Sequence, residues 1–117
     1  MKSSPQIFAL HYLFAPKNGI VVAHCLDLDL VVEGKDENTA ESRLNTVVRA
    51  AFAQAARAGN LALAIFPAPP HFWGELKHAK PLPPATLVIE TPPMVLQVEQ
   101  AVISEMPVLR AELALAA

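Results

Sequence analysis

Three acidic side chains, Asp27, Asp29 and Glu33, interrupt an apolar stretch in the first third of the chain. Carboxylates can hold metal ions for catalysis or attract a cationic partner. A two-metal nuclease needs carboxylates that converge from different elements onto ions about 4 Å apart. Carboxylates spaced along one strand diverge instead, and the preceding apolar run 7–14 carries none. We therefore expect no enzyme activity and no catalytic residue. Two interpretations of the three acidic residues remain: they form a solvated strand face, or they form an acidic docking face for a basic partner.

A histidine and the single cysteine are adjacent, at His24 and Cys25. Neighbouring residues of a strand point to opposite faces, so these two are not expected to bind one metal ion. The sequence has no Cys-x-x-Cys or His-x-x-x-His pair, and we predict no metal and no cofactor. A nucleophilic Cys25 with His11 as its base is the remaining alternative. Because a lone cysteine forms no internal disulfide, we expect a reducing compartment, the cytoplasm.

The only tryptophan, Trp73, lies in a proline-rich stretch between His71 and His78. One interpretation is a short helix that covers the edge or core of a sheet. The other is a recognition surface, because tryptophan is frequent among residues that dominate protein–protein binding. Trp73 therefore joins the three acidic residues as a candidate partner-binding residue.

The elements that would position these residues begin with an antiparallel sheet. Apolar residues 7–14 and 20–24 predict two strands, joined by a tight turn at Asn18-Gly19, where positive φ angles are favoured. Over 26–32, leucine and valine alternate with acidic residues. That period of two predicts a third strand with one buried and one acidic face.

A long helix is predicted after Gly34. Asp36 is a good N-cap, and Glu37 places negative charge in the first turn, where the helix dipole favours it. Gly59-Asn60 supplies a C-terminal stop. Between these ends, apolar residues recur at three- and four-residue spacing and form one stripe that would pack on the sheet: Ala40, Leu44, Val47, Val48, Ala51, Phe52 and Ala55.

The chain is less regular after the helix. Residues 61–66 fit either a further helical turn or a short strand. Pro70 can start a short helix over 71–79, since proline suits the first helical position. The inner face of that helix would carry Phe72, Trp73 and Leu76.

The last third is dominated by prolines. Residues 80–84 predict an extended linker, because proline disfavours the helical region for the residue before it. Residues 86–90 predict a strand, and 94–106 fit either a helix or a strand. Pro107 is expected to end either one.

Together these patterns predict an α+β fold in a single domain, residues 1–117. Three antiparallel strands followed by a long helix on the sheet would form a core of about 7–60. The proline-rich extension, 61–117, would contain a short helix and one or two further strands or a helix. A chain of 117 residues can bury such a core without disulfides or metals.

Composition narrows the classes of partner. The net charge is −2, and from Pro81 onward Arg110 is the only basic residue, so direct nucleic-acid binding is not expected. No apolar run approaches the roughly 18 residues of a membrane span, and we expect no membrane association. Hydrophobic residues make up 53% of the chain, which indicates a surface for self-association, as a homodimer or tetramer.

Residues 23–34, Ala-His-Cys-Leu-Asp-Leu-Asp-Leu-Val-Val-Glu-Gly, resemble the core of the HicB-like family, in which strands end in a glycine and a capped helix with an early alanine follows. Gly34, Asp36 and Ala40 occupy those positions. The resemblance covers roughly residues 7–60, and Gly59-Asn60 together with residues 66–73 resemble an extension of some HicB-like bacterial proteins. It implies a reduced RNase H-like fold of three antiparallel strands and a helix, usually with a further strand.

The resemblance also implies a function. The best understood HicB-like proteins are antitoxins that bind and mask HicA, a small basic ribonuclease, and many carry a C-terminal DNA-binding domain. This chain has no recognisable domain of that kind, and we expect no autorepression. We therefore predict an antitoxin that binds a HicA-type ribonuclease through Asp27, Asp29 and Glu33. The alternative is an orphan HicB-like module that self-associates and has no toxin partner.

Overall fold

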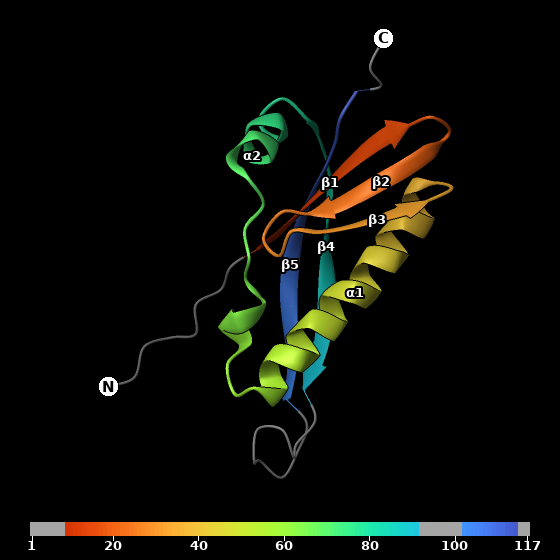
Figure 1. The fold of residues 1–117 in the computed structure, drawn as a ribbon. Coiled ribbons are helices and arrows are strands. Elements are labelled where there is room, and N and C mark those ends of the chain that lie inside the picture. The colour runs from red at the N-terminus through yellow and green to blue at the C-terminus, as the bar shows by residue number, and fades with distance from the viewer. Residues whose placement is uncertain (1–8, 92–101, 115–117) are drawn as a thin grey trace.

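One mixed sheet organises the residues that the computed structural model describes, 9–91 and 102–114. Within them the sheet has five strands in the order β3-β2-β1-β5-β4 (Figure 1). The elements are β1 (Leu10–Lys17), β2 (Ile20–Cys25), β3 (Leu30–Gly34), α1 (Glu37–Arg57), the 3₁₀ turn η1 (Leu61–Ala64), α2 (Pro70–Leu76), β4 (Lys80–Thr91) and β5 (Val102–Glu112). The predicted α+β class is confirmed. The predicted three-stranded sheet is too small, because β5 and β4 extend it beyond β1.

The first hairpin forms as predicted. β1 and β2 pair antiparallel with Lys17 opposite Ile20. The two turn residues have positive φ angles, 52° at Asn18 and 83° at Gly19. Successive positive φ angles match the twist of the flanking strands, which explains the Asn-Gly pair.

The third strand is shorter than the alternating pattern predicts. Residues 26–29 form a turn, and β3 begins at Leu30. Asp29 has a φ of 53°, a left-handed conformation outside strand geometry. Leu26 and Leu28 are nevertheless buried, so the turn keeps the hydrophobic alternation that predicted a strand.

Helix α1 follows the predicted pattern closely. The Asp36 side chain accepts a hydrogen bond from the Thr39 backbone N–H at 2.7 Å, and Gly59 after the helix has a φ of 88°. Val47, predicted in the apolar stripe, is 36% exposed and lies at its border. The buried positions of the helix are Ala40, Leu44, Val48, Phe52, Ala55 and Ala56.

Two prediction errors concern prolines in the last third. Residues 80–84 belong to β4 and form no linker. Because β4 lies at an edge of the sheet, its prolines need no partner for their missing N–H groups. The register shifts between Leu82 and Ala85, which is a β-bulge. Among the described residues β5 pairs with β1 only from Val108 onward, so Pro107 has one neighbouring strand and does not end β5. Of the ambiguous segment 94–106, residues 94–101 lie outside the described residues, and 102–106 belong to β5.

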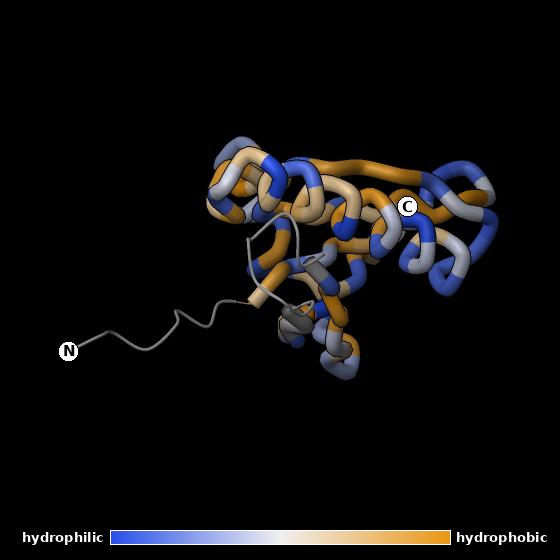
Figure 2. The backbone as a smooth tube through the Cα atoms, turned by 90° about the horizontal axis from the view of Figure 1, so that it is seen from below, coloured by the Kyte–Doolittle hydropathy of each residue, from blue (hydrophilic) through white to orange (hydrophobic). Residues whose placement is uncertain are grey.

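The sheet has a different cover on each face. Helix α1 packs on one face, over Leu10, Tyr12 and Phe14 of β1. On the other face, Leu13, Leu26 and Ala111 form a second cluster with the inner residues of α2 (Figure 1). α2 begins at Pro70 as predicted, and Phe72, Trp73 and Leu76 are its inner residues. In Figure 2 hydrophobic colour runs along extended stretches of the backbone, and hydrophilic colour gathers on the turns at the right edge of the view.

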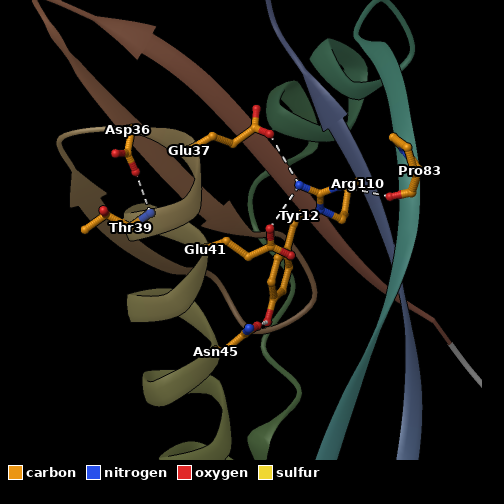
Figure 3. Close-up of polar contacts among 8 residues, drawn as sticks. All are labelled: Tyr12, Asp36, Glu37, Thr39, Glu41, Asn45, Pro83 and Arg110. Atoms are coloured by element: carbon orange, nitrogen blue, oxygen red, sulfur yellow. Dashed lines mark hydrogen bonds and ion pairs between the residues drawn. The ribbon is translucent and has the colours of Figure 1, made fainter.

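Arg110 of β5 ties α1 to the bulge of β4 (Figure 3). Its guanidinium lies 2.9 Å from Glu41 and 3.3 Å from Glu37, and it donates a 2.9 Å hydrogen bond to the Pro83 carbonyl. The same group lies 5.5 Å from the centre of the Phe14 ring. The only basic residue after Pro81 is therefore engaged inside the fold.

In the described parts of the chain, none of the helices combines the length and the apolar character that crossing a bilayer would need.

Candidate functional site

The turn at residues 26–29 is held between β1 and the segment that leads into α2. The Leu26 N–H donates to the His11 carbonyl at 2.9 Å. From the other side, the N–H groups of Phe66 and Ala68 donate to the carbonyls of Asp27 and Leu26 at 2.9 and 2.8 Å. These backbone bonds fix the turn that carries two of the predicted acidic residues.

Asp27 turns inward to His11. Its Oδ1 accepts the His11 backbone N–H at 2.6 Å, and its Oδ2 lies 3.1 Å from His11 Nδ1. Because a carboxylate only accepts hydrogen bonds, Nδ1 carries the proton and Nε2 is free to accept when the ring is neutral. The Asp27 side chain is 13% exposed. A partly buried carboxylate is thus oriented by one histidine.

Trp73 of α2 packs against the His11 ring. Its ring centre lies 5.2 Å from that of His11 in an edge-to-face geometry. The indole N–H donates to the Ala68 carbonyl at 3.1 Å. Two directional contacts therefore set the orientation of the indole.

A cleft of about 270 Å³ opens beside this group. It is lined by Asp27, Ile65, Pro67 and Trp73. Phe66, between two of these residues in the chain, is 68% exposed. The cleft thus combines one carboxylate with aromatic and aliphatic walls.

A second histidine–aspartate pair lies at the other end of the turn. His24 Nε2 is 2.7 Å from Asp29 Oδ1. His24 is 5% exposed, and its ring meets Phe72 edge-to-face with the centres 4.6 Å apart. The two pairs, each covered by an aromatic residue of α2, join the turn to that helix.

The structure separates the four predicted partner-binding residues into two groups. Asp27 and Trp73 line the same cleft. Asp29 shares the turn but bonds to His24, and Glu33 is exposed on β3 opposite Val22. Because Asp27 and Asp29 lie in a turn, the single acidic strand face predicted for the three carboxylates does not form.

Sequence reasoning assigned no partner to His11 except Cys25. Cys25 packs on the α1 face, whereas His11 lies on the opposite face beside Trp73. Burial raises the pKa of the Cys25 thiol to about 12, so it stays protonated at neutral pH. The alternation of β1 assigns His11 to the face away from Tyr12, but no local signal pairs it with Asp27, sixteen residues later.

Two further residues of the cleft, Ile65 and Pro67, carried no sequence signal as binding residues. Both belong to the segment between η1 and α2, whose path is set by the backbone bonds to the turn. Within residues 9–91 and 102–114, no group of three or more His, Cys, Asp or Glu side chains could hold a metal ion.

Comparison of this chain with protein-family models, with curated protein sequences and with solved structures gives no match.

Proposed function

We propose that this chain is a HicB-like, antitoxin-type protein that binds and masks a small basic ribonuclease of the HicA type. The proposal is a binding function without catalysis, exerted in the cytoplasm, where a lone thiol such as Cys25 stays reduced.

The observation that carries the proposal is the junction between β3 and α1. A Cβ added to Gly34 would lie 2.4 Å from the Ala40 backbone nitrogen, so only glycine allows this approach. Asp36 caps the helix between them. The glycine, the cap and the early alanine that carry the HicB-like resemblance therefore act as one packing unit. They follow three antiparallel strands, the element order that the resemblance implies.

The acidic residues on the surface opposite α1 favour a basic partner. Asp27 and Asp29 bond to histidines on that side, and Glu33 alternates with the inward-facing Val32. In the described residues, neither aspartate has a lysine or arginine within ion-pair distance. These three carboxylates place negative charge on this side, which steers a cationic protein toward it.

The test is a ribonuclease assay. The reading frame beside this chain's gene that encodes a small basic protein is expressed, and RNA cleavage is measured with and without the purified chain. We expect cleavage by the basic protein alone and its loss at a one-to-one ratio. The proposal is wrong if no adjacent frame encodes such a protein, or if cleavage continues with the chain in excess.

The second candidate, a self-associating module without a toxin, is favoured by the unequal edges of the sheet. Edge strand β4 carries three prolines and a bulge, which discourage strand pairing. Edge strand β3 has no proline, and its Val31 is 54% exposed. A second copy can therefore pair along β3.

Light scattering of the purified chain tests this candidate. A dimer or tetramer that Val31→Lys converts to a monomer, while Val47→Lys on α1 leaves it intact, supports pairing through β3. A monomer at micromolar concentration excludes it.

A further inference from the structure

We propose that the cleft formed by Asp27, Ile65, Pro67 and Trp73 binds one arginine side chain of a protein partner. The inference rests on the proposed function for the identity of the protein that carries this arginine. It names the chemical group that the cleft recognises, which the fold does not specify.

The charge of the cleft comes from Asp27, the one ionisable residue of its lining. Its side chain is 13% exposed, and among residues 9–91 and 102–114 its one ion-pair contact is His11. The contacts with the His11 backbone N–H and ring orient the carboxylate. Because water reaches the group poorly, attraction to a cation is stronger here than at an exposed carboxylate.

The walls suit a guanidinium better than a compact ammonium. Trp73 offers an indole next to the carboxylate, and arginine combines stacking on an aromatic ring with fork-like hydrogen bonding to a carboxylate. Ile65 and Pro67 offer apolar contact for the methylene stem of the same side chain. A volume of about 270 Å³ lies just below the roughly 300–1,000 Å³ typical of small-molecule sites and fits a single side chain.

Hydrogen bonds within the fold hold the walls of the cleft in place. The N–H groups of Phe66 and Ala68 hold its aliphatic wall to the turn, and the bond to Ala68 holds the indole. Binding then needs little ordering of the site, which favours even a small ligand.

Trp73 is the only tryptophan, so its fluorescence reports directly on this cleft. The probe is N-acetyl-arginine amide, and the matched neutral probe is N-acetyl-citrulline amide, which has nearly the same shape without the charge. We expect a saturable change in Trp73 emission with the arginine amide and none with the citrulline amide. Equal responses to both probes, or no saturable response to either, would overturn the inference.

Asp27→Asn supplies the matched variant, because the amide oxygen can still accept the His11 N–H while the charge is lost. It is expected to weaken binding of the arginine amide at least tenfold. Glu75→Gln, an exposed carboxylate on α2, is the control and should leave binding unchanged. Equal binding by wild type and Asp27→Asn contradicts the assignment.

If Asp27→Asn does not fold by circular dichroism, Pro67→Lys takes its place. Residue 67 is exposed and lines the cleft, so its ammonium would compete with the ligand and abolish the response. An unchanged response in Pro67→Lys overturns the inference.

The two experiments distinguish an error in the arginine site from an error in the proposed antitoxin function. Loss of RNA cleavage in the ribonuclease assay without arginine-amide binding rejects the cleft alone, whereas arginine-amide binding without a basic ribonuclease rejects the antitoxin role alone.

Discussion

At the scale of single residues, the approach of Gly34 to Ala40 is the tightest backbone constraint at the β3–α1 junction. An added Cβ would be 2.4 Å from the Ala40 nitrogen and 2.8 Å from its Cα. Both contacts are to backbone atoms, which cannot rotate away. The strand and helix must separate to accept any side chain there.

Gly34→Ala should therefore lower the free energy of unfolding by about 3 kcal/mol, the upper end of the cost of overpacking. Urea denaturation measures it. Gly74→Ala in α2 is the matched control, because a Cβ there meets nothing within 4 Å, and it should be neutral or stabilising. Equal losses in both variants would contradict the steric explanation.

The buried thiol of Cys25 predicts weaker stability in alkali. Burial raises its pKa from 9.0 to about 12, so between these values the native state keeps a proton that the unfolded chain releases. Stability must then fall as pH rises above 9. Burial also raises the pKa of Tyr12, which adds to the fall at higher pH.

Urea denaturation below and above pH 9 measures this slope. Cys25→Ala should remove the part of this pH dependence that Cys25 contributes and leave the part that Tyr12 contributes. An identical slope in wild type and Cys25→Ala, or rapid alkylation of the native thiol, would show that the thiol is not protected.

At the scale of elements, Arg110 couples α1 to β4 and β5. Its side chain is 13% exposed, and its partners Glu37 and Glu41 are 31% and 16% exposed. Among the described atoms its buried Nε has no hydrogen-bond partner, so the group depends on the two carboxylates and the Pro83 carbonyl. Burial and the nearby Glu112 raise the pKa of Glu37, a sign of crowded acidic groups around this cation.

Arg110→Met should cost about 2–4 kcal/mol of unfolding free energy at neutral pH, because it leaves two partly buried carboxylates unpaired. The loss should shrink as pH falls through the raised pKa of Glu37, since the protonated carboxyls no longer need the cation. Arg57→Met, at an exposed position of the last helical turn, is the control. A loss that does not vary with pH would contradict the electrostatic account.

The sequence predicts those elements that depend on residues close together in the chain. The Asn18-Gly19 turn, the Asp36 cap and the start of α2 at Pro70 each depend on neighbouring residues and are confirmed. Strand β5 depends on pairing between Leu10 and Val108, at opposite ends of the chain. Its one proline and those of β4 are tolerated only because of where the strands lie in the sheet, which local propensity does not reveal.

At the scale of the molecule, α2 and the segment before it bring two of the four predicted binding residues together. Asp27 and Trp73 were candidates for separate reasons, charge and hot-spot chemistry, and they line one cleft. The sequence could not predict this meeting, because it depends on hydrogen bonds between residues about forty positions apart. The predicted acidic strand face does not form, because Asp27 and Asp29 lie in a turn. Their side chains bond to His11 and His24 of the neighbouring strands.

The most direct test of the account is a side-by-side purification at native expression level of tagged wild type, Asp27→Asn and Glu105→Gln, with mass spectrometry of the bound proteins. Glu105 is exposed on β5 and controls for the loss of one negative charge. We expect a small basic protein at one-to-one ratio with wild type and Glu105→Gln, and much less with Asp27→Asn. Recovery of wild type with no protein except further copies of itself would contradict the claim that this chain binds a basic ribonuclease.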